Sequence, residues 1–478
     1  MDFLTLTPAL LLPWLLGMVV VLATRNPIYT LDDPGELAWI AGTGYLAGAI
    51  LATLWMRALS LAAIPFGRMS IAMPLLAISV AGSIFVWYRR DGASLALACR
   101  RALAPPPYVG IARLLWWAAC AWIALRFLLL GLEVSWQPLF PWEAWIAWAT
   151  KARVWFELGH MTSFVDAAQW LKSPGSEWFD AQPANPATLP LLQVYVCIAL
   201  GRWDDVLMNW PWWQFAVALA LLTYGGLRRL DATPAEALVG TYFVASLPLA
   251  NAHVALAGYP ELPLAAYFTA ATLALLRWAS IRARRDFVWA ALLAACCPLI
   301  KVAGWVWAPI LLMGWIVAVA PKLGRKLVIT AFAVSAAALL VLARTKVTLA
   351  GYTLHLDFAP SWAALVDNTL VFSNWNMLWY GVVAAIVLAW RRTLVPPLLP
   401  LSAIVAAHLF LVATLFAFPG VARLVADAPG VERAMLFGAP VLVAFMVLAY
   451  REFLVRCQPT PVVVVTAAAA AAAEPAPQ

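Results

Sequence analysis

The sequence predicts an all-α polytopic membrane protein. Apolar residues make up 65% of the chain and charged residues only 11%, whereas a soluble domain carries about 25% charged residues. Apolar stretches of roughly 20 residues recur along the chain, and each is long enough to cross the hydrocarbon core of a bilayer. These stretches lack the two-residue alternation of barrel strands, so their backbone polar groups must be satisfied within helices.

About thirteen transmembrane helices are predicted. The spans lie near residues 5–24, 37–56, 69–88, 114–132, 211–227, 237–254, 263–279, 288–300, 302–320, 325–343, 375–390, 395–418 and 434–450. They divide the chain into an N-terminal membrane extension at 1–110, a transmembrane core at 111–455 and an Ala/Pro-rich tail at 456–478. The composition of this tail predicts disorder.

The distribution of charge predicts the orientation of the helices. The net charge is +8, but Lys and Arg collect in the cytoplasmic loops of membrane proteins, so no nucleic-acid partner is needed to explain it. Alternate loops are basic, and we expect them to be cytoplasmic: they hold Arg89, Arg90, Arg100, Arg101, Arg113, Arg228, Arg229, Arg277, Arg282, Arg284, Arg285, Lys322, Arg325, Lys326, Arg391, Arg392, Arg451 and Arg456. The opposite loops hold most of the acids. The longest of them, residues 133–210, is predicted to be periplasmic.

The first 110 residues conflict with the charge rule. Three spans in this region put Arg57 and Arg68 on the periplasmic side and the acidic loop 30–36 on the cytoplasmic side. Residues 1–24 lack the basic start and the cleavage site of a signal peptide, so we expect them to form a retained helix.

The periplasmic loop opens with a Trp-rich segment, PWEAWIAWATKARVWF at 141–156. At 100° per residue, its aromatic and alanine side chains form one arc, and Glu143 points to the opposite side. This pattern predicts a helix at the membrane interface, with Glu143 facing away from lipid; a merely solvated Glu143 is the alternative. The apolar segment 186–201 is too short for a crossing, so we expect a re-entrant or interfacial helix there.

Three more charged residues stand out on the same side. Glu261 lies in the Pro-broken turn AGYPELP, where an acid near membrane level is costly without a role or a partner. Lys301 in CPLIKVAGW and Arg433 in GVERAMLF lie at outer ends of spans and could hold an anionic phosphate. Snorkelling of either cation to lipid headgroups is the alternative. With Glu143, these residues form a candidate site that combines acids with a phosphate clamp.

Several patches follow one another in an order that resembles a known family. They are PWEAWIAWATKARVWF at 141–156, GRWDDVLMNWPWWQFAVALALLTYGGLRRL at 201–230, HVALAGYPELPLAAY at 253–267, FSNWNMLWY at 372–380 and GVERAMLFGAP at 430–440. In these patches the chain resembles the GT-C glycosyltransferases, specifically the bacterial branch related to dolichyl-phosphate-mannose protein mannosyltransferases. The resemblance covers about residues 111–455.

This resemblance implies a GT-C-like helical bundle in the inner membrane of a bacterium. Its implied activity is transfer of a sugar from a polyprenyl-phosphate donor to a periplasmic lipid, polysaccharide or protein acceptor. Glu143 would act as catalytic base or position the acceptor, Glu261 would be the second acid, and Lys301 with Arg433 would hold the donor phosphate. The remaining residues implied in substrate binding are Trp142, Lys151, Arg153 and Tyr259. No cofactor is required, and a divalent cation is left open.

Two other functional classes remain open at this stage. Ala187 and Ala303 stand where the family often has acids, so a catalytically inactive assembly subunit is one alternative. A transporter or flippase of lipid-linked glycans is the other, although such proteins often show an internal repeat and charges at the bilayer midplane. The sequence names neither the sugar nor the acceptor nor the lipid chain.

Overall fold

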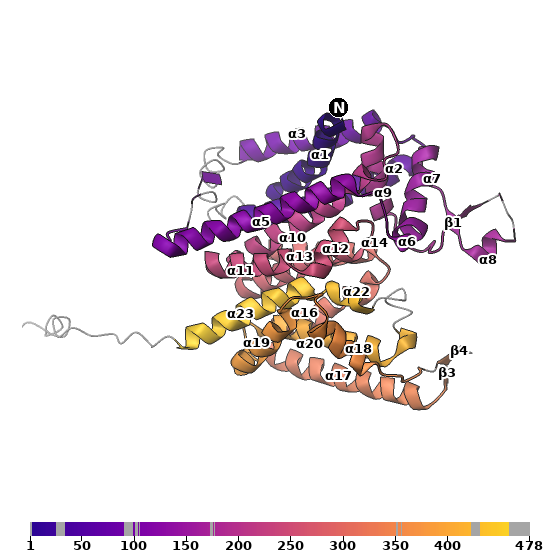
Figure 1. The fold of residues 1–478 in the computed structure, drawn as a ribbon. Helices are drawn as coiled ribbons and strands as arrows, with labels where there is room; N and C mark the ends of the chain where they lie inside the picture. Colours follow the sequence, from indigo (N-terminus) through magenta and orange to yellow (C-terminus); the bar gives the residue numbers. More distant parts are fainter. Residues whose placement is uncertain are drawn as a thin grey trace, which may run out of the picture.

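The computed structural model describes residues 2–24, 34–89, 99–100, 104, 106–172, 175, 177–349, 352–354, 356–421 and 431–457. Regular structure in this part of the chain is helical apart from two small sheets (Figure 1). One sheet pairs β1 (Phe164–Val165) with β2 (Trp178–Phe179) in parallel, and the other pairs β3 (Val347–Leu349) with β4 (Tyr352–Leu354) in antiparallel fashion. The predicted all-α class is confirmed.

Each of the thirteen predicted spans overlaps helical structure. The main helices are α1 (Asp2–Ala23), α2 (Glu36–Leu61), α3 (Arg68–Arg89), α5 (Gly110–Trp136), α10 (Trp210–Arg229), α11 (Pro234–Ala245), α12 (Pro248–Ala255), α13 (Glu261–Ile281), α14 (Arg284–Ile300), α15 (Gly304–Trp307), α16 (Ile310–Val319), α17 (Pro321–Arg344), α19 (Leu378–Thr393), α20 (Leu399–Ala417), α22 (Val431–Leu436) and α23 (Ala439–Cys457). The last of these helices runs into the predicted tail as far as Cys457, and residues 458–478 lie outside the described residues.

The loop predicted between residues 133 and 210 contains short elements. They are α6 (Trp142–Ala144), the π-helix η1 (Trp145–Ala149), α7 (Thr150–Leu158), α8 (Ala167–Trp170), α9 (Thr188–Leu200) and the 3₁₀-helix η2 (Leu207–Asn209). Another short pair, α18 (Trp362–Val366) and the π-helix η3 (Asp367–Val371), follows the second sheet. Figure 1 shows α7, α8, β1, β3 and β4 at one end of the helical bundle, which we call the loop end.

The protein is a multi-pass membrane protein. Among the described residues, seven helices are long and apolar enough to cross a membrane, and the pair α11–α12, bent by 57°, raises the number to eight if it forms one span. The seven are α1, α2, α3, α5, α13, α17 and α20. Because the other helices are shorter or less apolar, a crossing by all thirteen segments stays a prediction.

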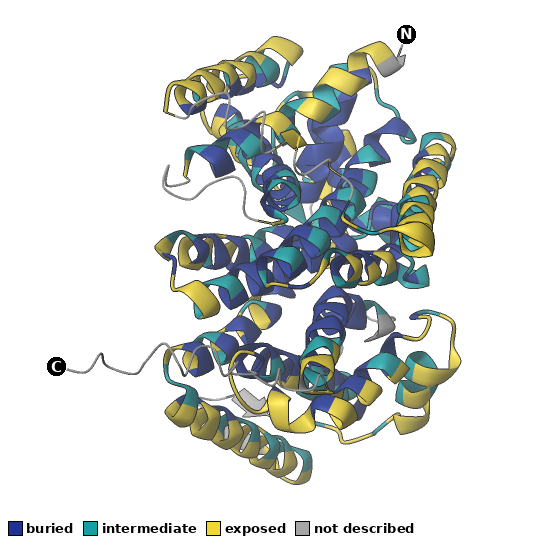
Figure 2. Ribbon diagram, turned by 90° about the vertical axis from the view of Figure 1, so that its left-hand side faces the viewer, coloured by how far each residue is buried: buried dark blue, intermediate teal, exposed yellow. Residues whose placement is uncertain are grey.

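Burial separates central helices from peripheral ones. In α13, 72% of the apolar window is buried within the protein, whereas the value for α17 is 6%. Figure 2 shows buried residues concentrated inside the bundle and exposed residues on the outer helices. An apolar helix that protein does not cover must be solvated by lipid, so α17 presents most of its surface to the membrane.

The N-terminal helices share one core with the rest of the chain. Helices α1 and α2 pack so closely at Gly17 and Gly48 that a Cβ on either residue would lie within 2 Å of backbone oxygen from the facing helix. The hydroxyl of Tyr45 donates to the Pro211 carbonyl at 3.1 Å, and that of Tyr267 donates to the Leu46 carbonyl at 2.7 Å. Helices α1 and α2 are therefore joined to the core by both apolar packing and hydrogen bonds.

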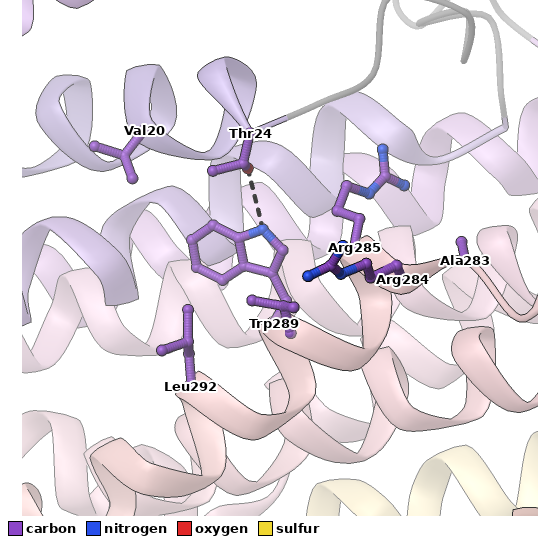
Figure 3. A pocket seen from close by; sticks show the side chains of 8 residues that line it. Val20, Thr24, Ala283, Arg284, Arg285, Trp289 and Leu292 are labelled. Carbon is purple, nitrogen blue, oxygen red and sulfur yellow. Dashed lines mark hydrogen bonds between the residues drawn. The ribbon is translucent and has the colours of Figure 1, made fainter.

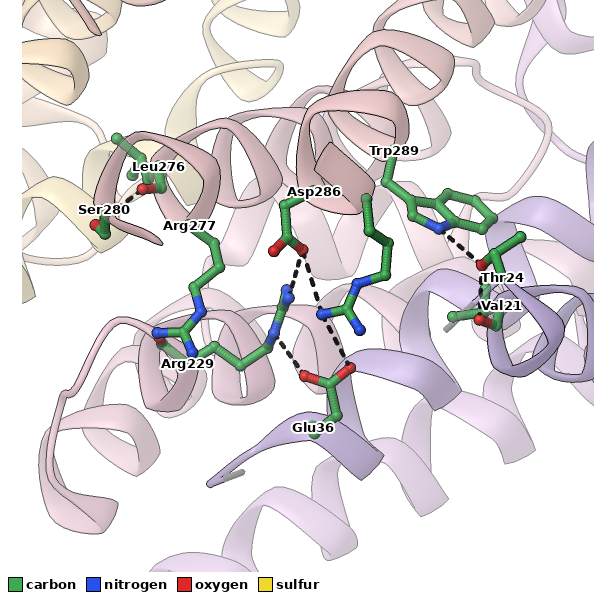
Figure 4. Close-up of polar contacts among 10 residues, drawn as sticks. Val21, Thr24, Glu36, Arg229, Leu276, Arg277, Ser280, Asp286 and Trp289 are labelled. Atoms are coloured by element: carbon green, nitrogen blue, oxygen red, sulfur yellow. Dashed lines mark hydrogen bonds and ion pairs between the residues drawn. The ribbon is translucent and has the colours of Figure 1, made fainter. Parts of the chain in front are cut away.

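A buried ion-pair network holds the opposite end of the bundle, which we call the arginine end. Arg229 contacts Glu36 at 2.8 Å and Asp286 at 2.6 Å, and its guanidinium lies 4.6 Å from the centroid of the Trp39 ring. Arg285 lies within 4 Å of both carboxylates. Figure 4 shows the carboxylates of Glu36 and Asp286 converging on Arg229 from two different helices.

This network compensates one of the charges that conflict with the charge rule in the predicted N-terminal topology. Glu36 belongs to the acidic loop predicted on the cytoplasmic side, and it is compensated there by Arg229 and Arg285. Residues 30–33 of that loop lie outside the described residues. At the loop end, Arg57 donates to the hydroxyl of Thr188 and Arg68 to the carbonyl of Ile198. Three of the charges that the rule disfavours, Glu36, Arg57 and Arg68, are thus engaged within the protein.

Replacing Arg229 by Met is expected to destabilise the protein strongly. The side chain is 1% exposed, and its loss would leave Glu36 and Asp286 facing each other with less compensation, at a cost of about 3–5 kcal/mol. The measurement is thermal unfolding of the detergent-purified protein. Arg392→Met, at an exposed position of α19, is the control and should change the melting temperature little; an equal loss in both variants would contradict the role of the network.

Candidate functional site

The four charged residues singled out in the sequence form two pairs at the loop end. Arg433 contacts Glu143 at 2.6 Å between Nη1 and Oε2, across 290 residues of sequence. Lys301 contacts Glu261 at 2.9 Å between Nζ and Oε1. Helices α13 and α22, which carry Glu261 and Arg433, pack directly on each other. We call the Glu143–Arg433 contact the outer pair and the Glu261–Lys301 contact the inner pair.

Exposure distinguishes the two pairs. In the outer pair, the Glu143 side chain is 29% exposed and that of Arg433 is 14% exposed. In the inner pair the corresponding values are 2% for Glu261 and 6% for Lys301. A molecule arriving at the loop end can therefore reach the outer carboxylate directly, whereas the inner carboxylate is closed off by protein.

The backbone around Glu143 is irregular, which corrects one sequence-based prediction. The chain passes from the single turn α6 into the π-helix η1, so residues here do not advance by 100°. Trp148 and Trp155, expected on a lipid-facing arc, are only 3% exposed and are buried in the protein, and α7 packs on α9. The prediction that this arc faces lipid is wrong, because the short helix α9 covers it.

The turn before α13 fixes the position of Glu143. Gly258 has φ +108°, and a Cβ there would lie 2.6 Å from the Ala144 Cβ and 2.7 Å from Leu139 Cδ1. Glycine is needed both for this conformation and for the close approach. The indole of Trp212 donates to the Tyr259 carbonyl at 2.6 Å. The residue next to Glu143 is thus packed against a turn that is itself anchored to α10.

The inner pair lies at two helix ends that proline and glycine define. Pro260 caps α13, so Glu261 occupies the first turn of that helix, where the helix dipole favours a carboxylate. Pro298 lies in the last turn of α14, and Lys301 follows the helix in an extended conformation. Gly304 allows the chain to turn back, since a Cβ there would lie 2.3 Å from the Cys297 carbonyl.

Aromatic groups line both pairs. The Arg433 guanidinium lies 4.8 Å from the centroid of the Tyr259 ring, and the Lys301 ammonium lies 5.7 Å from that of Phe437. Both distances are within the range of cation–π attraction. Burial raises the pKa of Tyr259, with Arg433 acting in the opposite direction. Burial would lower the pKa of Arg433, but Glu261 and Glu143 outweigh it and raise that pKa, so the guanidinium stays charged.

His253 also belongs to this cluster and is not predicted from the sequence. Its Nδ1 lies 3.7 Å from Glu261 Oε2, and its ring centroid lies 5.2 Å from that of Tyr259. The four histidines are dispersed in the sequence, so their spacing does not single out His253. His253 lies eight residues before Glu261, near the end of α12 and just before the turn to α13. This proximity in sequence was the one sign that the two side chains could meet. Among the described residues, no group of three or more metal-ligating side chains is present.

Lys151 lies away from the two pairs and holds the loop together. Its ammonium donates to the carbonyls of Gln182, Pro183 and Asn185 at 2.9–3.2 Å and lies 3.8 Å from Asp180. Burial lowers the pKa of Lys151 to about 8, with Asp180 opposing the shift. Burial likewise raises the pKa of Asp180, with Lys151 opposing. These contacts leave Lys151 little capacity to bind a substrate.

The other residues predicted to bind substrate have different surroundings. Arg153 pairs with Glu157 at 2.7 Å on the exposed face of α7, and its guanidinium lies 5.0 Å from the Trp203 ring centroid. Trp142 is 74% exposed beside Glu143. Ala187 precedes α9, and Ala303 is buried next to Lys301 along the chain. Of these positions, Trp142 and Tyr259 adjoin the outer pair.

No family model, curated protein or solved structure matches this chain. The chemistry must therefore be argued from the two pairs themselves. An exposed carboxylate can accept a proton, and a guanidinium beside it can bind a phosphate in a bidentate manner. An anion that attracts Arg433 would release Glu143 to act as a base.

We expect the inner pair to show strong coupling in stability. Lys301→Met leaves the Glu261 carboxylate buried without its cation, which should cost about 3–5 kcal/mol, while Glu261→Gln/Lys301→Met should recover much of that loss. The measurement is thermal unfolding of both variants and of Glu261→Gln alone. A double variant no more stable than Lys301→Met would contradict the pairing.

Lys151→Met should expose the loop to protease. Hydrogen bonds to a charged group contribute about 1.5–3 kcal/mol each, so their loss should speed trypsin cleavage at the exposed Lys172 at least about tenfold through local opening. Arg153→Gln removes an exposed cation from the same helix and serves as control. Equal cleavage rates in the wild type and Lys151→Met would show that the lysine does not close the loop.

Proposed function

We propose that this protein is a membrane glycosyltransferase that moves a sugar from a polyprenyl-phosphate donor to a periplasmic lipid, polysaccharide or protein acceptor. The observation that carries the proposal is the outer pair, an accessible carboxylate 2.6 Å from a guanidinium at the loop end. The resemblance of the loop and turn sequences to the GT-C family supports the same assignment. We further propose that all thirteen helical segments cross the inner membrane of a bacterium, with residues 133–210 on the periplasmic side.

The proposed reaction needs one base and one anion clamp. The acceptor hydroxyl attacks the anomeric carbon, the bond from that carbon to the phosphate oxygen breaks, and the hydroxyl proton passes to Glu143. The lipid phosphate leaves with the bonding electrons and is stabilised by Arg433. Attack opposite the leaving phosphate inverts the anomeric configuration. Without substrate, Arg433 and Glu143 neutralise each other, so the site tolerates both charges.

The inner pair gives the site a second cation and a second acid. Lys301 would add charge to the phosphate clamp, while Glu261 would orient the acceptor. Both side chains are nearly inaccessible. They would therefore act indirectly, by holding the turn that carries Tyr259 and the helix α22 that carries Arg433. Their burial supports a positioning role more than direct proton transfer.

The position of the pairs favours a lipid-borne donor. Glu261 starts a helix that is apolar enough to span a membrane, so the site lies close to headgroup level at its end of the bundle. A phosphate attached to a membrane-embedded chain reaches this level without leaving the lipid. A cytosolic nucleotide sugar has no route to the periplasmic side, which excludes it as the direct donor in this proposal.

Replacement of Glu143 by Gln should reduce sugar transfer at least about 100-fold, the typical loss when a general base is removed. The assay follows transfer from a radiolabelled polyprenyl-phosphate-sugar pool into membrane acceptors at matched expression. Glu157→Gln is the control, because Glu157 is an exposed acid in the same loop that pairs with Arg153, and it should retain full activity.

Arg433→Gln should lower transfer with a rise in the apparent KM for the donor, since it removes a phosphate contact. Unchanged transfer in Glu143→Gln would refute the assigned base. If the wild type transfers nothing from several donors, a transporter or an assembly subunit replaces the glycosyltransferase.

A further inference from the structure

A cavity of about 450 Å³ opens at the arginine end, between the end of α1 and the start of α14. It lies at the opposite end of the bundle from both acid–base pairs and has no part in the proposed transfer reaction. Figure 3 shows its lining side chains converging from these two helices. They are Val20, Thr24, Ala283, Arg284, Arg285, Val288, Trp289 and Leu292.

The lining divides into a cationic rim and an apolar wall. Arg284 and Arg285 begin α14 and form the rim. Val288 and Leu292 follow one and two turns later on the same face of the helix, and they are 42% and 52% exposed. Their exposure makes the wall continuous with the lipid-facing surface of the protein, so an acyl chain can enter from the side.

Trp289 lies between the cationic rim and the apolar wall of the cavity. The Trp289 ring is largely buried, and its indole N–H donates to the Thr24 hydroxyl at 3.2 Å, a contact drawn in Figure 3. Tryptophan with a polar contact on one side and apolar packing on the other is typical of the headgroup level of a membrane. The cavity therefore spans the level where phosphate groups and the first acyl carbons of lipids lie.

Among the residues that the structure describes, the charge balance favours an anion at the rim. The two arginines and two carboxylates of the buried network, Arg229, Arg285, Glu36 and Asp286, sum to zero net charge. Arg284 is exposed and has no ion-pair partner within the described part of the chain. Its positive charge is therefore uncompensated by that network.

We propose that this cavity binds one anionic glycerophospholipid. Its headgroup phosphate lies against Arg284 and Arg285, and one acyl chain runs along Val288 and Leu292 toward Val20. Basic pockets between transmembrane helices on the cytoplasmic side are suited to such headgroups. The bound lipid bridges α1 and α14, adding a contact between the N-terminal extension and the core beside the buried network.

The test measures retention of single lipids by the full-length, detergent-purified protein in native mass spectrometry. Phosphatidylglycerol and phosphatidylcholine with identical acyl chains are titrated into wild type. We expect one tightly held phosphatidylglycerol and much weaker phosphatidylcholine binding. Arg284→Gln should weaken phosphatidylglycerol binding about fivefold, and Val288→Trp, which fills the cavity from an exposed position, should abolish this tight binding.

Arg325→Gln is the matched control, because Arg325 is an exposed arginine near the start of α17 outside the cavity. It should bind phosphatidylglycerol as the wild type does. Equal binding of both lipids, or an equal loss in Arg325→Gln, would overturn the proposal in favour of diffuse surface charge. Displacement by millimolar inorganic phosphate would also overturn it, since the acyl chain would then contribute nothing.

Discussion

The compensation of buried charge is the constraint on which this structure depends. A chain that is 65% apolar has few places for an ionised group, and an unpaired charge inside it costs several kcal/mol. At the arginine end, Arg229 is enclosed by carboxylates from α2 and α14. At the loop end, Glu261 and Lys301 join the start of α13 to the end of α14. Asp286 lies at the start of α14 and Lys301 directly follows its end. The length and orientation of α14 therefore set the distance and direction between the two charge clusters.

Close backbone packing converts this charge arrangement into a defined site. Glu143 stands on an irregular segment that could adopt several positions by itself, but the contact between Ala144 and Gly258 leaves no room between that segment and the turn before α13. The Trp212 hydrogen bond then holds the turn against α10. Arg433 reaches the same point from the far end of the sequence. The geometry of the outer pair thus depends on the absence of a side chain at Gly258 as much as on the charges of Glu143 and Arg433.

Helical segments could be predicted from the sequence because hydrophobic length is a local property, and all thirteen predicted segments overlap helices. The residues of the site could be chosen because an acid or a lysine at a span end is costly without a partner. Their pairing could not be derived, since no periodicity relates Glu143 to Arg433 across 290 residues. The prediction that the aromatic arc faces lipid failed because α9 buries this arc within the protein. Lys151 resembled a ligand-binding residue in sequence, while its three carbonyl contacts depend on the fold of a distant loop segment.

The two pairs differ in exposure, and this difference suits them to different roles. The buried inner pair is suited to stabilising the fold, and the accessible outer pair to the proposed chemistry. A fully buried pair cannot exchange its partner for a substrate without exposing an uncompensated charge, so the inner pair suits a permanent structural role. The outer pair is partly hydrated, and water can stabilise either member when the other turns away. In the proposed reaction, the contact of Arg433 with the Tyr259 ring would guide the guanidinium from the carboxylate to the phosphate. The proposed transfer reaction would use the two pairs differently: the closed inner pair would hold the helices, and the open outer pair would change partners.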